Sequence, residues 1–328
     1  MEQKHVEIQT DAPCIGIMCI DVATELASHF GKQWHSFIAS SYVKHLEAAG
    51  AFVVPIWIGR DRSYYEHMMN QLNGILLPGG AVFINDADLI GKPDLTNDCV
   101  QSAYHIFDVA EEMNRAGKYF PLWGTCLGFQ LMIIRAAKST KVRTDCENIR
   151  RTLPMQLTKD FRQSQMLQQL PQCLADEMGR SPFACHNHKY CITNNELDHF
   201  KLSNDWHILA THSDANGKEF INLIEHRQWP MFGCQFHPER AAFEQLYASL
   251  DNWKHSHTRV SIELAQSFAH IFVDACRRNL SRFASPEQKS KHLIWNWQPV
   301  FSGHLKESKF LQCYLFEKNV DYPKLRES

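Results

Sequence analysis

Short apolar runs alternate with helix-like segments through the first 140 residues, and this alternation limits the fold more than any other feature of the sequence. A chain that alternates strands and helices builds a parallel sheet covered by helices on both faces. We therefore predict an α/β fold with a mostly parallel central sheet in three layers. The predicted strands are 14–20, 52–58, 74–77 and 119–123, and the predicted helices are 36–49, 64–72, 98–117 and 129–137.

The second half of the chain predicts antiparallel additions to that sheet. Residues 141–200 are polar and irregular, which indicates insertions and short antiparallel strands. Strands at 208–212, 220–225 and 231–236 follow, and Asp214-Ala215-Asn216-Gly217 is a hairpin signal. A helix at 261–278 precedes an aromatic tail, which we expect to pack on the body. The simplest organisation is a single domain at 13–316, with a polar extension at 1–12 and a tail at 317–328.

Composition excludes several classes of function. The formal charge of −2 over 328 residues gives no electrostatic reason to expect nucleic acid or an anionic membrane as a partner. No stretch approaches the roughly 18–20 apolar residues of a membrane helix. The eleven cysteines include no CxxC pair. Cys185, His186, His188 and Cys191 could suggest zinc, but their spacing matches no familiar zinc pattern, so we expect no metal.

The strongest chemical signal is a glycine-flanked cysteine between a predicted strand and a predicted helix, in Gly124-Thr125-Cys126-Leu127-Gly128. A tight turn between strand and helix projects one side chain above the sheet, as in a nucleophile elbow. The positive end of the helix dipole then favours the thiolate. We predict that Cys126 is a nucleophile of lowered pKa and that the N–H of Leu127 donates to an oxyanion. Taken alone, the pattern also describes a buried cysteine at a strand end.

The segment Gln235-Phe236-His237-Pro238-Glu239 ends another predicted strand and offers acid–base partners for a cysteine. Residues two apart in an extended segment project to the same side, so His237 and Glu239 can lie together. The carboxylate can fix the imidazole tautomer and leave the other ring nitrogen facing the thiol as general base. A lone His-Pro-Glu is more often a surface turn, but together with the cysteine turn it favours a triad.

The segment Leu76-Leu77-Pro78-Gly79-Gly80 places two glycines directly after a predicted strand. Loops at the carboxyl ends of parallel strands gather where ligands bind. Gly80 is therefore the candidate for a second oxyanion donor, and Gly79 is a candidate substrate contact. Read alone, the motif also fits a tight turn.

At these residues the chain resembles the class I glutamine amidotransferase superfamily, whose nucleophile turn, His-Pro-Glu segment and Gly-Gly loop all match. Within it, the chain resembles the gamma-glutamyl hydrolase family, the folate polyglutamate-cleaving enzymes of peptidase family C26. The resemblance extends over about residues 13–316. It rests on residues 39–51, 73–80, 119–129, 187–190 and 312–316.

The resemblance implies a flavodoxin-like fold and a lysosomal or secreted hydrolase that removes γ-linked glutamates from pteroylpolyglutamates, often as a homodimer. It implies a small-molecule substrate as partner and no metal or organic cofactor. Cys126 is then the nucleophile, His237 the base and Glu239 its orienting partner. His188 is carried over as a substrate-site histidine, although a lone histidine is more often structural. Lys189 is a candidate partner for substrate carboxylates.

Two features depart from this resemblance. Gln130, a further candidate substrate contact, stands where gamma-glutamyl hydrolases usually carry Glu and amidotransferases usually carry Gln. No basic segment followed by an apolar core is visible near the start, so no signal peptide is apparent; the protein stays inside the cell, or a signal has been removed. The sequon Asn279-Leu280-Ser281 is compatible with a secretory route, although so short a pattern often occurs by chance.

Together these residues predict acyl transfer through a thioester on Cys126. Three alternatives stay open: a glutaminase subunit of an amidotransferase, a γ-glutamyl hydrolase acting on small amine conjugates, and an inactive binding protein on the same fold. The sequence contains no GxxxxGK loop and no synthase domain, which disfavours the first. The complete triad disfavours the last.

Overall fold

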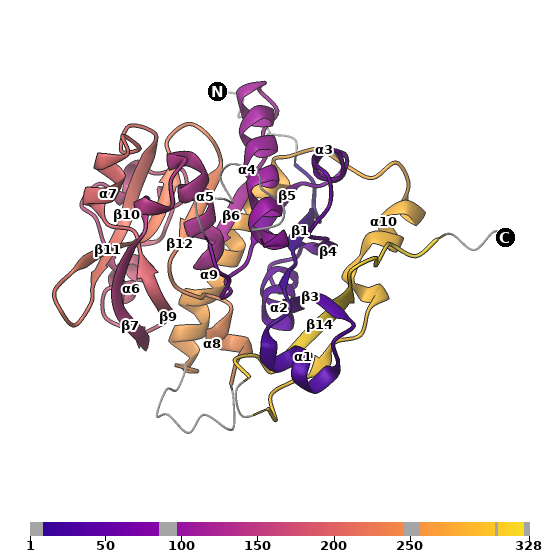
Figure 1. Cartoon of the computed structure of the whole chain (residues 1–328). Helices are drawn as coiled ribbons and strands as arrows, with labels where there is room; N and C mark the ends of the chain where they lie inside the picture. Colours follow the sequence, from indigo (N-terminus) through magenta and orange to yellow (C-terminus); the bar gives the residue numbers. More distant parts are fainter. Residues whose placement is uncertain (1–8, 85–96, 246–255, 306–307, 325–328) are drawn as a thin grey trace.

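An eight-stranded mixed sheet forms the centre of the computed structural model, which describes residues 9–84, 97–245, 256–305 and 308–324 (Figure 1). The sheet consists of β1 (Cys14–Met18), β4 (Phe52–Ile56), β5 (Gly74–Leu77), β6 (Leu122–Thr125), β8 (Gln156–Leu157), β10 (Trp206–Ser213), β11 (Glu219–His226) and β12 (Met231–Cys234). The strand order is β4-β1-β5-β6-β12-β11-β10-β8. Neighbours from β4 to β12 are parallel, whereas β11, β10 and β8 add antiparallel strands. The predicted parallel sheet with C-terminal antiparallel additions is confirmed.

Helices cover both faces of the parallel part of this sheet. On β6 the Trp123 ring packs against Phe268 and Phe272 of α9, while the next residue, Gly124, lies against Phe129 of α5. Both faces of the strands are therefore buried, which explains why they read as continuous apolar runs. The helices are α1 (Thr24–Phe30), α2 (Ser40–Glu47), α3 (Arg62–Met69), α4 (Asp98–Arg115), α5 (Leu127–Ala137), α6 (Gln172–Met178), α7 (Asn194–His199), α8 (Arg240–Phe243), α9 (Arg259–Arg277) and α10 (Pro286–His292). Short 3₁₀ turns lie at Thr140–Val142, Phe161–Gln163 and Ile294–Asn296.

The two helical layers follow from side-chain spacing. Helix α9 buries Leu264, Phe268 and Phe272, which are four residues apart and therefore share one face. Its first turn is capped by Thr258, whose hydroxyl accepts a hydrogen bond from the N–H of Ser261 at 3.1 Å. Helix α9 packs beside α2, and α3, α4 and α5 pack in sequence on the other face. Among the described residues, no helix is both long and apolar enough to cross a membrane.

The predicted helix at 36–49 is wrong in its first part. Residues Trp34–Ala39 form strand β3, and α2 begins only at Ser40. Strand β3 pairs with β2 (Ile20–Asp21) and with β14 (Gln312–Glu317), which also pairs with β13 (Val300–Phe301) in a second sheet. The partner strand β14 lies far away in the sequence, so local helical spacing could not reveal this pairing.

The polar segment that follows α5 contains a long antiparallel pair rather than short strands alone. Strand β7 (Thr144–Leu153) pairs with β9 (Ala184–Cys191), with an irregularity between Asp145 and Ile149. The predicted hairpin at residues 214–217 is confirmed, since the N–H of Asp214 donates to the carbonyl of Lys218 at 3.0 Å and Gly217 has a φ of 77°.

The aromatic tail packs on the body, as predicted, although Trp295 and Phe301 remain largely exposed. The packing continues beyond the predicted boundary at 316. The hydroxyl of Tyr322 donates to the carbonyl of Pro55 at 2.6 Å, and its ring lies 5.1 Å from that of Trp57. The single domain at 13–316 stays a prediction. Residues 1–8 and 325–328 of the predicted extension and tail lie outside the described residues.

Candidate active site

Three loops converge at the carboxyl edge of the sheet because β5, β6 and β12 are parallel neighbours. Leu77 pairs with Gly124, and Thr125 pairs with Cys234, so the three strands end at one level. Cys126 follows β6, the Gly-Gly loop follows β5, and the segment that holds His237 follows β12. The topology thus brings together three motifs that are spread over more than 150 residues of the sequence.

Cys126 occupies a strained turn between β6 and α5. Its φ of 50° and ψ of −100° are unusual for a residue with a side chain. Its N–H donates to the carbonyl of Cys234 at 2.7 Å, which fixes the turn to β12. A Cβ on Gly128 would lie 2.1 Å from the carbonyl oxygen of Leu77, so only glycine fits next to the end of β5, the strand that precedes the Gly-Gly loop. Backbone strain of this kind often marks a functional site.

The expected lowered pKa of Cys126 is not what the site produces. Burial raises the pKa of the Cys126 thiol to about 12, and the nearby negative charge of Glu239 adds to this effect. Arg240 and hydrogen bonds from the N–H of Leu127 and the amide of Gln235 act in the opposite direction. The helix N-terminus therefore does not outweigh desolvation, and the resting Cys126 side chain is a thiol whose ionisation would need a base.

His237 has the arrangement of such a base. Its Nδ1 lies 2.8 Å from Oε1 of Glu239, and both side chains are buried. Burial lowers the pKa of His237, while Glu239 counteracts part of that effect, and His237 in turn holds the pKa of Glu239 below its usual value. A neutral imidazole beside an ionised carboxylate is the state that can accept a proton from a thiol through Nε2.

Tyr42 supports both this histidine and the Gly-Gly loop, a role that the sequence did not suggest. Its hydroxyl accepts a hydrogen bond from the N–H of Gly79 at 2.8 Å and lies 3.2 Å from Nδ1 of His237. The N–H of Gly79 is thus occupied, whereas no described residue accepts from the N–H of Gly80. A Cβ on Gly79 would lie 2.4 Å from Cε1 of His237, so the loop approaches the imidazole as closely as glycine allows.

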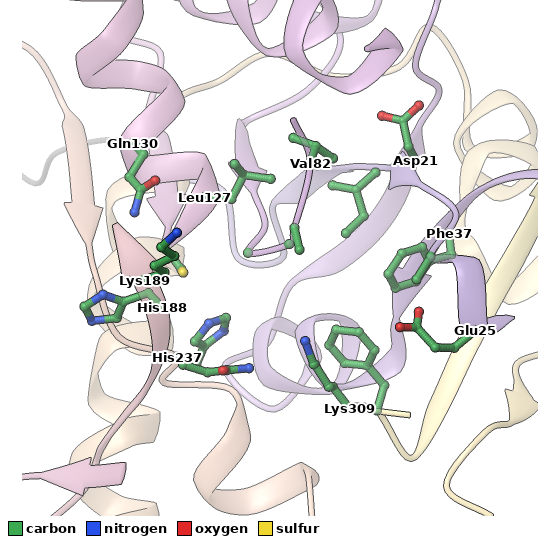
Figure 2. A pocket seen from close by; sticks show the side chains of 18 of the residues that line it. Asp21, Glu25, Phe37, Val82, Leu127, Gln130, His188, Lys189, His237 and Lys309 are labelled. Atoms are coloured by element: carbon green, nitrogen blue, oxygen red, sulfur yellow. The ribbon is translucent and has the colours of Figure 1, made fainter. Parts of the chain in front are cut away.

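A pocket of about 580 Å³ opens over the cysteine, a volume suited to a small-molecule ligand. Figure 2 shows His188 and Lys189 on one side, with Asp21 and Glu25 on the other. All predicted site residues line this pocket except Glu239, which supports His237 from behind. The lining residues named by the sequence are Gly79, Gly80, Cys126, Leu127, Gln130, His188, Lys189 and His237.

Gln130 and His188 are engaged by protein partners within this pocket. The amide of Gln130 donates to the carbonyl of Tyr190 at 3.0 Å and to Oε1 of Gln235 at 3.1 Å. Gln235 in turn donates to the sulfur of Cys126 at 3.5 Å. The two ring nitrogens of His188 lie 3.0 Å from Nδ1 of His186 and from the carbonyl of Tyr190. Gln130 therefore connects strand β9 with Gln235 beside Cys126, whereas these contacts of His188 lie within β9.

The pocket is richer in cationic side chains than the sequence suggested. Besides Lys189, the side chains of Arg143, Arg150, Arg240 and Lys309 line it, against the two carboxylates of Asp21 and Glu25. The Arg143 guanidinium lies 4.1 Å from the centre of the Tyr190 ring, which holds it at the pocket wall. The insertion and the C-terminal loop supply most of these cations, and only the folded structure brings them together.

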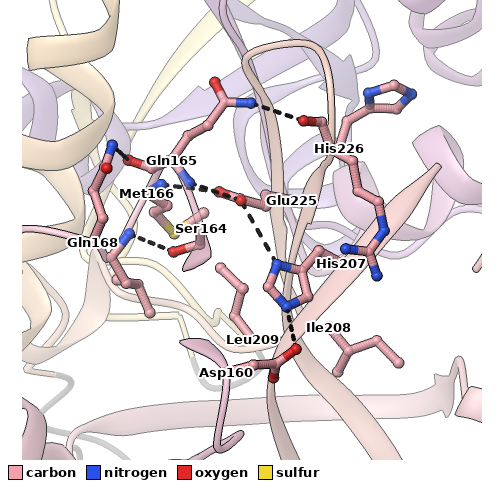
Figure 3. A network of polar contacts seen from close by, with 12 residues as sticks. Asp160, Ser164, Gln165, Met166, Gln168, His207, Ile208, Leu209, Glu225 and His226 are labelled. Carbon is pink, nitrogen blue, oxygen red and sulfur yellow. Dashed lines mark hydrogen bonds and ion pairs between the residues drawn. The ribbon is translucent and has the colours of Figure 1, made fainter. Parts of the chain in front are cut away.

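In the described part of the chain, the histidine–cysteine cluster included, no group of three or more His, Cys, Asp or Glu side chains is arranged to hold a metal ion. A second polar cluster lies away from the pocket and fastens the insertion to the sheet (Figure 3). In it, the carboxylate of Glu225 accepts hydrogen bonds from the N–H groups of Gln165 at 2.8 Å and Met166 at 2.9 Å. His207 links this carboxylate to Asp160, whose Oδ2 lies 2.9 Å from its Nε2.

Comparisons with known sequences assign this chain to a family. A sequence model of the peptidase C26 family matches residues 13–239. The chain belongs to the peptidase C26 family. Gamma-glutamyl hydrolase B of Dictyostelium discoideum is 31% identical over 322 residues, which cover 98% of this chain and 88% of that protein. Human gamma-glutamyl hydrolase is 32% identical over 308 residues, which cover 93% and 90%.

This membership of peptidase C26 makes the chain a hydrolase, as the sequence predicted. Among solved structures, the glutaminase domain of Trypanosoma brucei CTPS with bound acivicin has a TM-score of 0.49 and 14% identity over 84% of this chain and 97% of that one. The family assignment rests on the sequence comparisons alone.

Proposed function

We propose that this peptidase C26 member is a cysteine hydrolase that cleaves γ-glutamyl bonds of folylpoly-γ-glutamates. The observation that carries the proposal is the placement of Cys126 and His237 on one pocket, with Glu239 bonded to the far side of the imidazole. The relatives named gamma-glutamyl hydrolase support the choice of bond.

The first step of the proposed reaction is transfer of the thiol proton from Cys126 to Nε2 of His237. The thiolate attacks the side-chain carbonyl of a γ-linked glutamate, and a tetrahedral oxyanion forms. The N–H groups of Leu127 and Gly80 are the donors that would hold this oxyanion. The imidazolium then protonates the leaving amine, and water, deprotonated by the same imidazole, hydrolyses the thioester and restores the thiol.

Five cationic residues line the pocket and are called the cationic wall: Arg143, Arg150, Lys189, Arg240 and Lys309. Their charge supports a substrate that carries carboxylates. A γ-linked glutamate chain presents one free α-carboxylate at every residue, and guanidinium and ammonium groups are the partners such carboxylates prefer. Arg143, Arg150 and Lys189 lie on the insertion at one side of the pocket, and Lys309 lies on the C-terminal loop. The proposed substrate therefore extends from the nucleophile along this wall.

The test is product analysis with two substrates. The wild type, Cys126→Ala and, as a matched control, Cys173→Ser are incubated with a pteroyl-pentaglutamate and with free glutamine, and the products are resolved by chromatography. Cys173 is an exposed cysteine outside the pocket. Shortened folates from the wild type and Cys173→Ser, but not from Cys126→Ala, are expected.

Other outcomes would decide between the alternatives. Glutamate and ammonia from glutamine, with the folate intact, would replace the proposal by a glutaminase. If both substrates stay intact, a short γ-glutamyl amine conjugate is added as a third substrate, and release of amine from it alone would narrow the substrate to such conjugates. No turnover by a folded wild type would leave a binding protein on the same fold.

The lysosomal or extracellular address and the homodimer stay predictions from the resemblance. The sequon does not support the address, because Asn279 is buried and engaged within the protein. Its Oδ1 accepts a hydrogen bond from the N–H of Ser281 at 2.9 Å, and its amide donates to the carbonyl of Leu72 at 3.4 Å. A glycan on this side chain would require the surrounding packing to open.

A further inference from the structure

A pair of cysteines on β7 and β9 lies beside the pocket and takes no part in the proposed hydrolysis. Cys191 is fully buried at the end of β9, and Cys146 on β7 is partly exposed. Cys191 forms a small buried cluster with Ile149 and Phe220 that is separate from the main core, and Cys146 packs against this cluster. Cys191 pairs with Thr144 of β7, two residues before Cys146, and no disulfide joins the two cysteines in this structure.

The backbone around Cys146 is held in place from both sides. The carbonyl of Asp145 accepts a hydrogen bond from Nζ of Lys218 at 2.5 Å. The N–H of Glu147 donates to Oδ2 of Asp214 at 3.0 Å. The regular pairing of β7 with β9 is interrupted between Asp145 and Ile149, and such an irregularity redirects side chains. Cys146 is thus aimed at the end of β9 by contacts to the β10–β11 turn.

Cys146 also contacts the strand that lines the pocket. Its sulfur lies 3.6 Å from Nδ1 of His188 and donates to the carbonyl of Lys189 at 3.3 Å. The neighbouring Cys191 thiol and the contact with His188 lower the pKa of the Cys146 thiol to about 6, whereas the same neighbour and burial raise the pKa of Cys191. Cys146 donates to Lys189 as a thiol, and its lowered pKa makes the thiolate that attacks disulfides accessible near neutral pH.

We infer that Cys146 and Cys191 form a reversible disulfide on the rim of the pocket when the protein meets a low-molecular-weight disulfide. Two thiols that pack in one cluster on paired strands can reach an S–S bond of about 2.05 Å by local rotation. Among the eleven cysteines, eight others are buried and only Cys173 is exposed. Cys146 thus combines access to the solvent with a thiol partner in contact.

The chemistry balances in two exchange steps. The Cys146 thiolate attacks one sulfur of the small disulfide, forms a mixed disulfide and releases one small thiolate. Cys191 then loses its proton to solvent, and its sulfur attacks the Cys146 sulfur and displaces the second small thiolate. In sum, two protein thiols and one small disulfide give one protein disulfide and two small thiols.

The bond would join β7 to the end of β9 that carries Lys189 and Tyr190 into the pocket. It would also remove the Cys146 thiol that contacts His188. The oxidised protein should therefore hold this wall of the pocket more rigidly than the reduced one. The inference does not rest on the proposed hydrolase activity, since the bond can be detected without any substrate.

The test uses the full chain carrying Cys126→Ala, so that the nucleophile cannot exchange. The reduced protein is treated with hydroxyethyl disulfide at pH 7.5, and free thiols are then blocked and the peptides mapped by mass spectrometry. A Cys146–Cys191 cross-link is expected, reversed by dithiothreitol, with a higher melting temperature for the oxidised form. Adding Cys191→Ser should stop the reaction at a mixed disulfide on Cys146, while adding Cys173→Ser, the matched control, should leave the cross-link unchanged.

The opposing results are equally direct. A mixed disulfide on Cys146 with Cys191 still free would overturn the inference, and so would the absence of any change at either cysteine while Cys173 reacts. Since turnover is not measured, a failed hydrolase assay has no bearing on this result.

Discussion

Replacement of Glu239 by Gln tests whether the buried carboxylate stabilises the imidazolium of His237. The substitution keeps the size of the side chain and removes its charge. Nδ1 of His237 and Oε1 of Glu239 are 2.8 Å apart, so the charge centres lie about 4 Å apart. At an effective dielectric constant of about 20, their attraction is about 4 kcal/mol. Because each 1.36 kcal/mol is a tenfold change in rate, kcat/KM should fall by about 10³-fold in Glu239→Gln.

The pH profile gives a second, independent signature. Burial lowers the pKa of His237 and Glu239 raises it, so loss of the carboxylate lowers it further. The base works when neutral, and the acid limb of kcat/KM marks its protonation. This limb should therefore move to lower pH in Glu239→Gln even though the rate falls. A change that merely loosened the fold would lower the rate without moving the limb in this direction.

The assay is the initial rate of folate shortening between pH 4 and 8, with melting temperatures to check folding. Glu244→Gln is the matched control, because Glu244 is also a buried carboxylate but accepts its hydrogen bond from the N–H of Leu311, at 2.7 Å. Burial raises the pKa of Glu244 to about 7, so it carries only part of a charge near neutrality. A folded Glu239→Gln with kcat/KM within tenfold of the wild type would refute the reasoning, as would an equal loss in Glu244→Gln.

Three further outcomes follow from the geometry. Gly128→Ala should destabilise the fold by about 1–3 kcal/mol or more and abolish turnover, because the added methyl group would lie 2.1 Å from the carbonyl oxygen of Leu77. The control Gly179→Ala should change stability little, and urea denaturation measures the stability of both variants. Glu225→Gln loses an acceptor for one backbone N–H and should cost about 1–3 kcal/mol in the same assay, unlike the exposed Glu219→Gln. In the wild type, the midpoint of the acid limb of kcat/KM should lie below pH 6.5, because burial lowers the pKa of His237; a midpoint above 6.5 would contradict this.

The sequence predicted the strands of the central sheet because each of them has a local signal in the sequence. Strands buried on both faces are continuous apolar runs, and β5 was placed at Gly74–Leu77 from that signal alone. Strand β3 was missed for the opposite reason. It is defined by its pairing with β14, and the spacing of Phe37 and Val43 gave an equally good helical pattern. A signal that depends on distant pairing cannot be found in a local window.

Candidate site residues were predictable where the chemistry lies in contiguous motifs. Cys126 and His237 follow strand ends, and parallel neighbours bring their strand ends together. The support from Tyr42 was not predictable, since nothing local marks a tyrosine on α2 as a partner of the Gly79 loop. The cationic wall was missed because its members come from an insertion and a tail whose path depends on tertiary packing.

The lowered pKa expected for Cys126 shows how a correct local principle can be outweighed. A helix N-terminus favours a thiolate, but that gain falls with the burial of the same thiol and with a carboxylate nearby. In the proposed reaction, Cys126 ionises only when a base takes its proton. The negative charge of Glu239 destabilises the thiolate of Cys126, and the same charge stabilises the imidazolium of His237. The opposite balance holds at Cys146, where the neighbouring Cys191 and His188 lower the pKa by more than burial raises it. The proposed rim disulfide and the proposed hydrolysis at Cys126 therefore depend on opposite shifts of a thiol pKa within one protein.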